Sequence, residues 1–132
     1  MSCLVSAIEK AVLVPAAYLK TVSAADRDAF IKLAEEINYH LLVTFGEDMA
    51  TEAPLIKQWS KNVQALKQPA IHMMRETVME HGFCPDYVTC CTGDENEACL
   101  LREEGLTVYE AKTENAAVLI KKLRDAAPKY AA

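Results

Sequence analysis

The chain has 132 residues, of which 52% are hydrophobic and 25% charged, so it is long enough for one globular domain with a buried core. Its formal charge is −5, and its basic residues are scattered along the chain. The sequence therefore lacks the clusters of Lys and Arg that bind nucleic acid or anionic membranes. Its longest apolar stretches, about six residues, fall far short of the roughly twenty that span a membrane. We therefore expect a single domain over residues 1–132 with no nucleic-acid partner and no membrane contact.

The cysteines and the first residues indicate a compartment. The chain has five cysteines, an odd number, and its start has no basic region before an apolar one, unlike a signal peptide. This pattern predicts free thiols in a reducing environment, because structural disulfides are rare in the cytosol. We therefore expect a cytoplasmic location.

The N-terminal part predicts a strand, a helix and a second strand. Residues 10–15 (KAVLVP) are an apolar run that ends in proline, and residues 39–46 (YHLLVTFG) are another that ends in glycine. Between them Ser23 and Asp26 fit a helix cap, and the helix has an apolar face made of Phe30, Leu33, Ala34 and Ile37. Periodicity alone cannot separate a buried strand from a continued helix, so a helix over residues 24–45 is the alternative.

A long helical region is expected next. Apolar residues recur at helical spacing after a possible cap at Thr51: Leu55, Trp59, Val63 and Leu66. Pro69 breaks this pattern and can open a second helix, which ends near Gly82 and has an apolar face of Ile71, Met74 and Val78. The apolar stripe over residues 51–81 either covers the domain's own sheet or offers a surface to a protein partner or a second copy.

The C-terminal part predicts strand, helix, strand, helix. Residues 86–91 (DYVTCC) are rich in strand-forming types, and Asp94 with Glu97 fits the cap of a helix that stops at Gly105. Residues 106–111 (LTVYEA) predict another strand. Thr113 can cap a last helix, whose apolar face is Ala116, Leu119, Ile120, Leu123 and Ala127.

Together these elements predict an α/β fold. We expect a small, Rossmann-like, doubly wound domain with a mainly parallel sheet of roughly four strands and a long two-helix crossover. The alternative is an α+β fold, a helical bundle with a small parallel sheet at its C-terminal end. The last fifty residues resemble the strand–helix repeats of many doubly wound domains, a resemblance that implies no function.

A binding site in such a fold lies beyond the carboxyl ends of the strands. The loops expected there are residues 15–23, 46–53, 91–97 and 111–116, and their candidate ligand-binding residues are Glu47, Asp48, Thr92, Asp94 and Thr113. Acidic residues and threonines at helix starts also cap free backbone amides, and that role competes with ligand binding. The segment TGDENE has one glycine, and its acids would repel phosphate, so we expect no nucleotide and no other cofactor.

The cysteines offer two further hypotheses. A metal site would draw on Cys84, Cys90, Cys91 and Cys99, but the chain lacks the knuckle spacing typical of zinc or iron–sulfur ligands. Neighbouring strand residues also point to opposite faces of a sheet, which separates Cys90 from Cys91. A thiol nucleophile at Cys91 or Cys90 is favoured by the helix start that follows, but no histidine has a sequence relation to it, and acidic residues oppose a thiolate.

No catalytic pattern outweighs a structural explanation of the same residues. The leading hypothesis is a non-catalytic cytosolic accessory or interaction domain, as a homo-oligomer or with a protein partner. Any small-molecule ligand would bind at the carboxyl edge of its sheet. The alternatives are a thiol-dependent enzyme or redox sensor that uses Cys91 or Cys90, and a cysteine-ligated metal protein.

Overall fold

A computed structural model describes residues 10–46 and 63–126, and these form an α/β fold with one parallel sheet. Within these residues the sheet has five strands in the order β3-β2-β1-β4-β5. The strands are β1 (Ala11–Pro15), β2 (His40–Phe45), β3 (Val63–Lys67), β4 (Val88–Thr92) and β5 (Thr107–Glu110). The predicted fold class is therefore confirmed, and the alternative of a helical bundle is wrong because residues 40–44 pair with β1.

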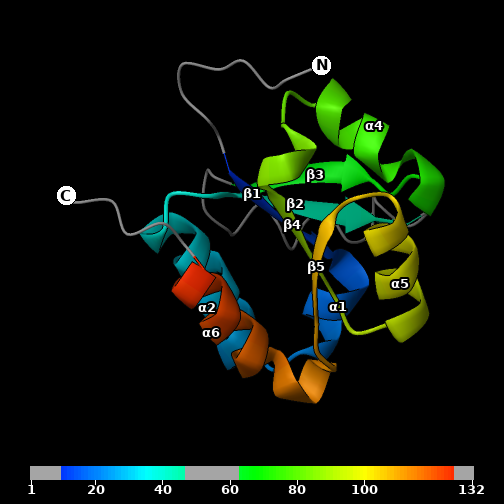
Figure 1. Cartoon of the computed structure of the whole chain (residues 1–132). Helices are drawn as coiled ribbons and strands as arrows, with labels where there is room; N and C mark the ends of the chain where they lie inside the picture. The colour runs from blue at the N-terminus through cyan, green and yellow to red at the C-terminus, as the bar shows by residue number, and fades with distance from the viewer. Residues whose placement is uncertain (1–9, 47–62, 127–132) are drawn as a thin grey trace.

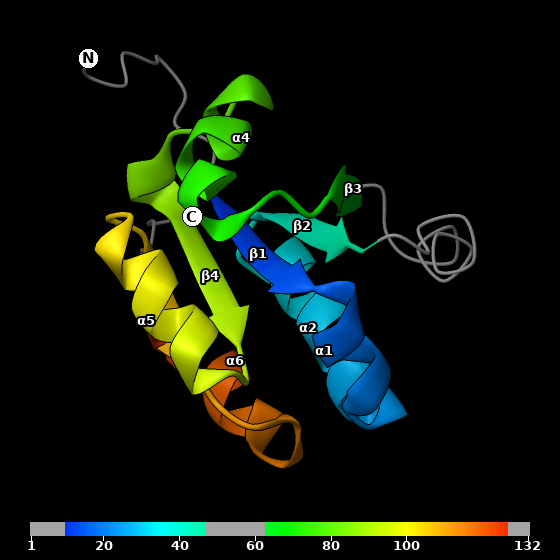
Figure 2. The same ribbon diagram turned by 90° about the vertical axis from the view of Figure 1, so that its right-hand side faces the viewer.

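Helices cover both faces of the sheet. They are α1 (Ala16–Thr21), α2 (Ala24–Glu36), α4 (Met74–Glu80), α5 (Glu95–Glu103) and α6 (Ala116–Ala126), with 3₁₀ turns η2 (Ile71–Met73), η3 (Pro85–Tyr87) and η4 (Thr113–Asn115). Figure 1 shows α2 and α6 side by side on one side of the sheet, with α5 on the other. Figure 2 shows β1 and β4 running in the same direction, with α1 at the tip of β1. No helix of the described residues is long and apolar enough to cross a membrane.

The core consists of two layers, one on each face of the sheet. Val12 and Val14 of β1 pack with α1, α2 and α6, whereas Ala11 and Leu13 of the same strand pack with α4 and α5. Successive strand residues alternate between these layers. A parallel sheet buried on both faces needs apolar residues at every position, which is why its strands read as continuous apolar runs.

Local capping follows the sequence predictions at two helices. The Asp26 N–H donates to the Ser23 hydroxyl oxygen over 3.1 Å, and the Glu97 N–H donates to an Asp94 carboxylate oxygen over 3.1 Å. Gly105, just past the end of α5, has a φ of 83°, which glycine adopts without steric strain.

The crossover after β2 differs from the prediction. Val63 and Leu66 were expected on a helix, but residues 63–67 form β3 and pair with β2 from Leu41 to Phe45. Leu66 is buried in the layer with α4, so the backbone pairing and one buried side chain together outweigh a helical spacing. The two-helix crossover expected between residues 39–46 and residues 86–91 is therefore wrong. Strand β3 lies between these two segments, and within the described residues α4 is the only α-helix between β3 and β4. The rest of the first expected helix, including Thr51, lies outside the described residues.

Three smaller predictions are also corrected. Residues 16–21, expected as loop, form α1 directly after β1. Residues 85–87 form a 3₁₀ turn, so β4 begins at Val88 and extends to Thr92. Thr113 is not the side-chain cap of the last helix, because Lys112 occupies the cap position of η4 and no side-chain cap bond forms there.

Candidate functional site

The sheet has a topological switch point between β1 and β4. The chain leaves β1 toward β2 through α1 and α2, which cover one face, and it leaves β4 toward β5 through α5, which covers the other. Connections that diverge in this way leave a crevice at the carboxyl ends of the two central strands.

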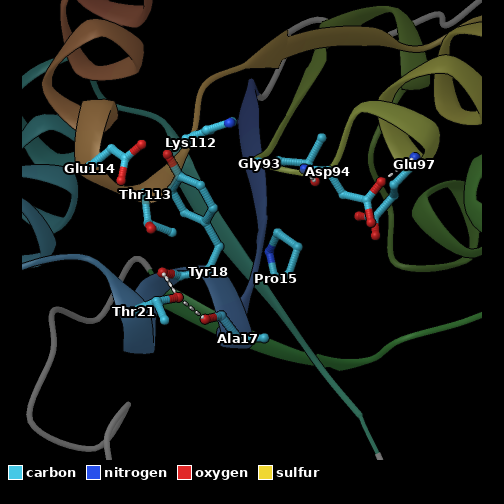
Figure 3. Close-up of a pocket in the computed structure, with 11 residues that line it drawn as sticks. Pro15, Ala17, Tyr18, Thr21, Gly93, Asp94, Glu97, Lys112, Thr113 and Glu114 are labelled. Atoms are coloured by element: carbon cyan, nitrogen blue, oxygen red, sulfur yellow. Dashed lines mark hydrogen bonds between the residues drawn. The ribbon is translucent and has the colours of Figure 1, made fainter.

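A pocket of about 490 Å³ lies at this switch point, and we call it the edge pocket. Its walls come from three segments that follow β1, β4 and β5 (Figure 3), and its lining residues are Pro15, Ala17, Tyr18, Thr21, Thr92, Gly93, Asp94, Glu97, Lys112, Thr113 and Glu114. The volume falls within the roughly 300–1,000 Å³ typical of small-molecule sites.

The wall after β4 is a network of acidic residues and a buried threonine. The Thr92 hydroxyl oxygen accepts the Asp94 N–H over 3.1 Å, and Asp94 caps α5 through the Glu97 N–H. Burial and the negative charge of Asp94 raise the pKa of Glu97, and a hydrogen bond with Thr92 offsets part of this rise. Thr92 thus contacts the backbone of Asp94 and the carboxyl group of Glu97 at the start of α5.

The wall after β1 is dominated by Tyr18. This side chain is only 6% exposed, and its ring packs edge-on against Phe30 with 6.3 Å between ring centres. Burial, followed by the charges of Cys91 and Asp26, raises the pKa of Tyr18 to about 12, so the phenol carries its proton at neutral pH. Its hydroxyl has no hydrogen-bond partner among the described residues. An unpaired buried hydroxyl costs about 1–3 kcal/mol.

Gly93 lets these walls approach each other. A Cβ atom at this position would lie 3.2 Å from the Ala111 carbonyl oxygen and 3.2 Å from Cε2 of Tyr18. The turn after β4 can therefore contact both the end of β5 and the Tyr18 ring only because residue 93 has no side chain.

The wall after β5 carries mixed charge. Lys112, Thr113 and Glu114 lie at one end of the pocket in Figure 3, and Asp94 and Glu97 lie together at the other. Lys112 and Glu114 are exposed, as is Asp94, whereas Thr113 and Glu97 are partly buried.

The structure brings together part of the predicted site. Thr92, Asp94 and Thr113 all line the edge pocket, while Glu47 and Asp48 lie outside the described residues. Sequence reasoning did not single out Tyr18, Gly93 or Glu97 as pocket residues. Glu97 was assigned only to a cap, and Tyr18 lies in a segment expected to be loop, so its position after the first strand was the one available signal.

The cysteines of β4 lie on opposite faces of the sheet. Cys90 is buried in the layer with α4 and α5, and Cys91 is buried in the layer with α1, α2 and α6. Burial, and then the charge of Glu97, raise the pKa of Cys90 to about 12. Burial, and then Cys90, raise the pKa of Cys91 even further. Both thiols are therefore protonated and enclosed, the opposite of an activated nucleophile.

The four cysteines proposed for a metal site do not come together. Cys84 is disulfide-bonded, contrary to the expectation of free thiols, and Cys99 is an exposed free thiol on α5. Among residues 10–46 and 63–126 there is no group of three or more His, Cys, Asp or Glu side chains that could hold a metal ion.

A second, smaller pocket of about 310 Å³ lies between η2 and α5. Its lining comes from two helical segments and consists of Ile71, His72, Leu100, Glu103 and Glu104. It contains neither strand-end residues nor an unpartnered buried hydroxyl, so the edge pocket is the stronger candidate.

Comparisons with known proteins assign no family. No protein-family model matches the chain, and no curated protein matches it either.

Proposed function

We propose that this protein is a non-catalytic accessory or interaction domain that binds a small molecule in the edge pocket. The observation that carries the proposal is the position of the pocket, at the carboxyl ends of the two central strands where their connections diverge. The unpartnered hydroxyl of Tyr18 in the pocket wall supports it, because capping and packing leave that group unexplained.

The thiol alternative finds little support in the same region. A reactive cysteine needs access and a lowered pKa, whereas Cys90 and Cys91 are buried and have raised pKa values. The metal alternative lacks converging ligands among the described residues.

An accessory role implies a protein partner or a second copy of the chain. Exposed large apolar side chains are available for such a contact at Met73, Met79, Leu100 and Val118. Size-exclusion chromatography with light scattering tests the homo-oligomer, and a monomer at all concentrations would contradict it. We also propose a cytoplasmic location, and the disulfide at Cys84 weighs against it. Imaging of the tagged protein in its cell tests this point, and a signal in an oxidising compartment would contradict it.

A ligand screen with a blocked pocket tests the binding site. Ala17 is exposed and lines the edge pocket, so Ala17→Trp places an indole in it. Ala117 is exposed on α6 outside the lining, and Ala117→Trp is the matched control. We expect compounds that raise the melting temperature of the wild type and of Ala117→Trp to lose that effect in Ala17→Trp. Hits that stabilise all three proteins equally would contradict the proposed site.

A further inference from the structure

The Tyr18 hydroxyl lies at one end of the edge pocket. Figure 3 shows the ring extending from α1 toward Lys112, away from the start of α5. Two contacts fix the ring there. It packs edge-on against Phe30, and a Cβ atom on Gly93 would lie 3.2 Å from both Cε2 of the ring and the Ala111 carbonyl oxygen. The ring is therefore held between α2 and the segment that follows β5.

This hydroxyl has a proton to donate and no protein group to accept it. Tyr18 is only 6% exposed, and its hydroxyl has no hydrogen-bond partner among the described residues. Its pKa of about 12 keeps the proton on the oxygen at neutral pH. Buried polar groups of folded proteins are nearly always paired, so an unpaired one requires an explanation. Packing does not supply it, because a phenylalanine ring would pack in the same way.

The side chains next to the hydroxyl are free to admit a ligand. Lys112 and Thr113 lie at the same end of the pocket, and neither side chain forms a hydrogen bond or ion pair with another described residue. Lys112 is also exposed, and exposed side chains change rotamer rapidly. Its side chain can therefore turn toward solvent and let a ligand atom reach the hydroxyl of Tyr18.

The charges of the pocket narrow the class of ligand. Three carboxylates in its lining face one ammonium group: Asp94, Glu97 and Glu114 against Lys112. Burial, followed by the charges of Cys91 and Asp26, raises the pKa of Tyr18, and no cation of the described residues is among these causes. An anion at the hydroxyl would meet the same negative field. A cation without a lone pair cannot accept the phenol proton, whereas an uncharged carbonyl oxygen can.

We propose that the edge pocket binds a small uncharged molecule through a carbonyl oxygen, which accepts a hydrogen bond from the Tyr18 hydroxyl. This inference rests on the proposed function, since it assigns a ligand class to the same pocket. The carbonyl oxygen lies at the end of the pocket near Lys112, and the rest of the molecule extends along Pro15 and Gly93.

A titration followed by NMR tests the ligand class. Benzamide is the uncharged probe with a carbonyl oxygen. Benzoate and benzamidinium have the same shape, but benzoate is an anion and benzamidinium is a cation with no acceptor atom. All three are titrated at neutral pH and constant ionic strength. We expect benzamide to give saturable shifts of the backbone amides of Gly93, Lys112 and Thr113, and the two ions to give none at the same concentration.

Removal of the hydroxyl supplies the second arm. Tyr18→Phe keeps the ring and removes only the donor. Tyr87→Phe is the matched control, because Tyr87 precedes β4 and lies outside the pocket lining. We expect Tyr18→Phe to weaken benzamide binding roughly fivefold, the factor that corresponds to about 1 kcal/mol for one hydrogen bond, and Tyr87→Phe to leave it unchanged. Without ligand, Tyr18→Phe should melt at the wild-type temperature or above it, because it removes an unpaired buried group.

Four results would overturn the ligand class. Equal benzamide affinity in Tyr18→Phe and the wild type would show that the hydroxyl does not contact the ligand. A lower melting temperature of ligand-free Tyr18→Phe would show that the hydroxyl already has a partner. Saturable shifts with benzoate or benzamidinium but not with benzamide would reject the uncharged acceptor, and no shift with any probe would reject it too. The Ala17→Trp screen separates these failures from a failure of the proposed function, because that screen does not depend on the chemistry of the ligand.

Discussion

The two cysteines at the end of β4 and the turn that follows them are neighbours in the chain, yet they serve different purposes. Cys90 and Cys91 are enclosed by the two core layers, and their pKa values are raised. Gly93, Asp94 and Glu97, a few residues later, line a pocket open to ligands. This difference shows that the side chains of a central parallel strand pack in the core on both faces of the sheet. Polar side chains can therefore face a ligand only where the strand ends.

The largest effect expected within this comparison is at Cys91. Cys91→Ser places a hydroxyl in the apolar layer with α1 and α6, and we expect it to lower the free energy of unfolding by about 1–3 kcal/mol, the usual cost of an unsatisfied buried hydroxyl. Urea denaturation measures the loss, and Cys99→Ser, an exposed position, should change stability by less than about 0.5 kcal/mol. Rapid modification of Cys91 by a thiol reagent in the native protein would contradict the enclosed site.

Gly93 tests the close approach of the walls. In Gly93→Ala the new methyl group meets a backbone carbonyl and the Tyr18 ring at 3.2 Å, and we expect a loss of roughly 1–2 kcal/mol from overpacking. Gly46→Ala is the matched control, because a Cβ there has no atom within 4 Å. Thermal unfolding of both variants decides the point, and equal melting temperatures would argue against a tight contact at Gly93.

Two variants of Asp94 distinguish the loss of the helix cap from the loss of the negative charge. We expect Asp94→Ala to lower the free energy of unfolding by about 1 kcal/mol, because it removes the acceptor of the Glu97 N–H, whereas Asp94→Asn should retain most of the stability. Chemical denaturation of the two variants at neutral pH makes the comparison. If both lose the same amount, the side chain acts through its charge and not as a cap.

Replacement of Glu97 should have the smallest effect on stability, and that effect should depend on pH. Its pKa is raised in the folded protein, so folding favours the protonated form, and this contribution is present at acidic pH and lost as the pH rises through the folded pKa. We expect Glu97→Gln to be slightly more stable than the wild type at pH ~7 and to match it below the unfolded pKa of about 4.3. Denaturation midpoints at the two pH values measure this, and a variant that is less stable at neutral pH would reverse the sign.

The elements that depend on local interactions could be predicted from the sequence. The caps at Ser23 and Asp94 use a side chain and a backbone N–H three residues later, so the sequence spacing alone reveals them. The location of the pocket followed from the strand order, because the carboxyl ends of parallel strands meet at one edge. Thr92, Asp94 and Thr113 were identified for this reason.

The features that depend on distant contacts could not be predicted. The spacing of Leu66 from the apolar residues before it fits a helix, yet Leu66 lies in the edge strand β3. Only the pairing of β3 with β2 selects the strand. The burial of Tyr18 depends on Phe30 and Gly93, which come from other elements, so its unpaired hydroxyl leaves no trace in the local sequence.

The most direct test of the account is a crystallographic soak of the wild-type protein with a mixture of small amines, neutral alcohols and carboxylates. We expect electron density for a bound compound at the carboxyl ends of β1, β4 and β5, in contact with residues that line the edge pocket. Binding only between Ile71 and Leu100 in the second pocket, with no compound in the edge pocket, would contradict the account.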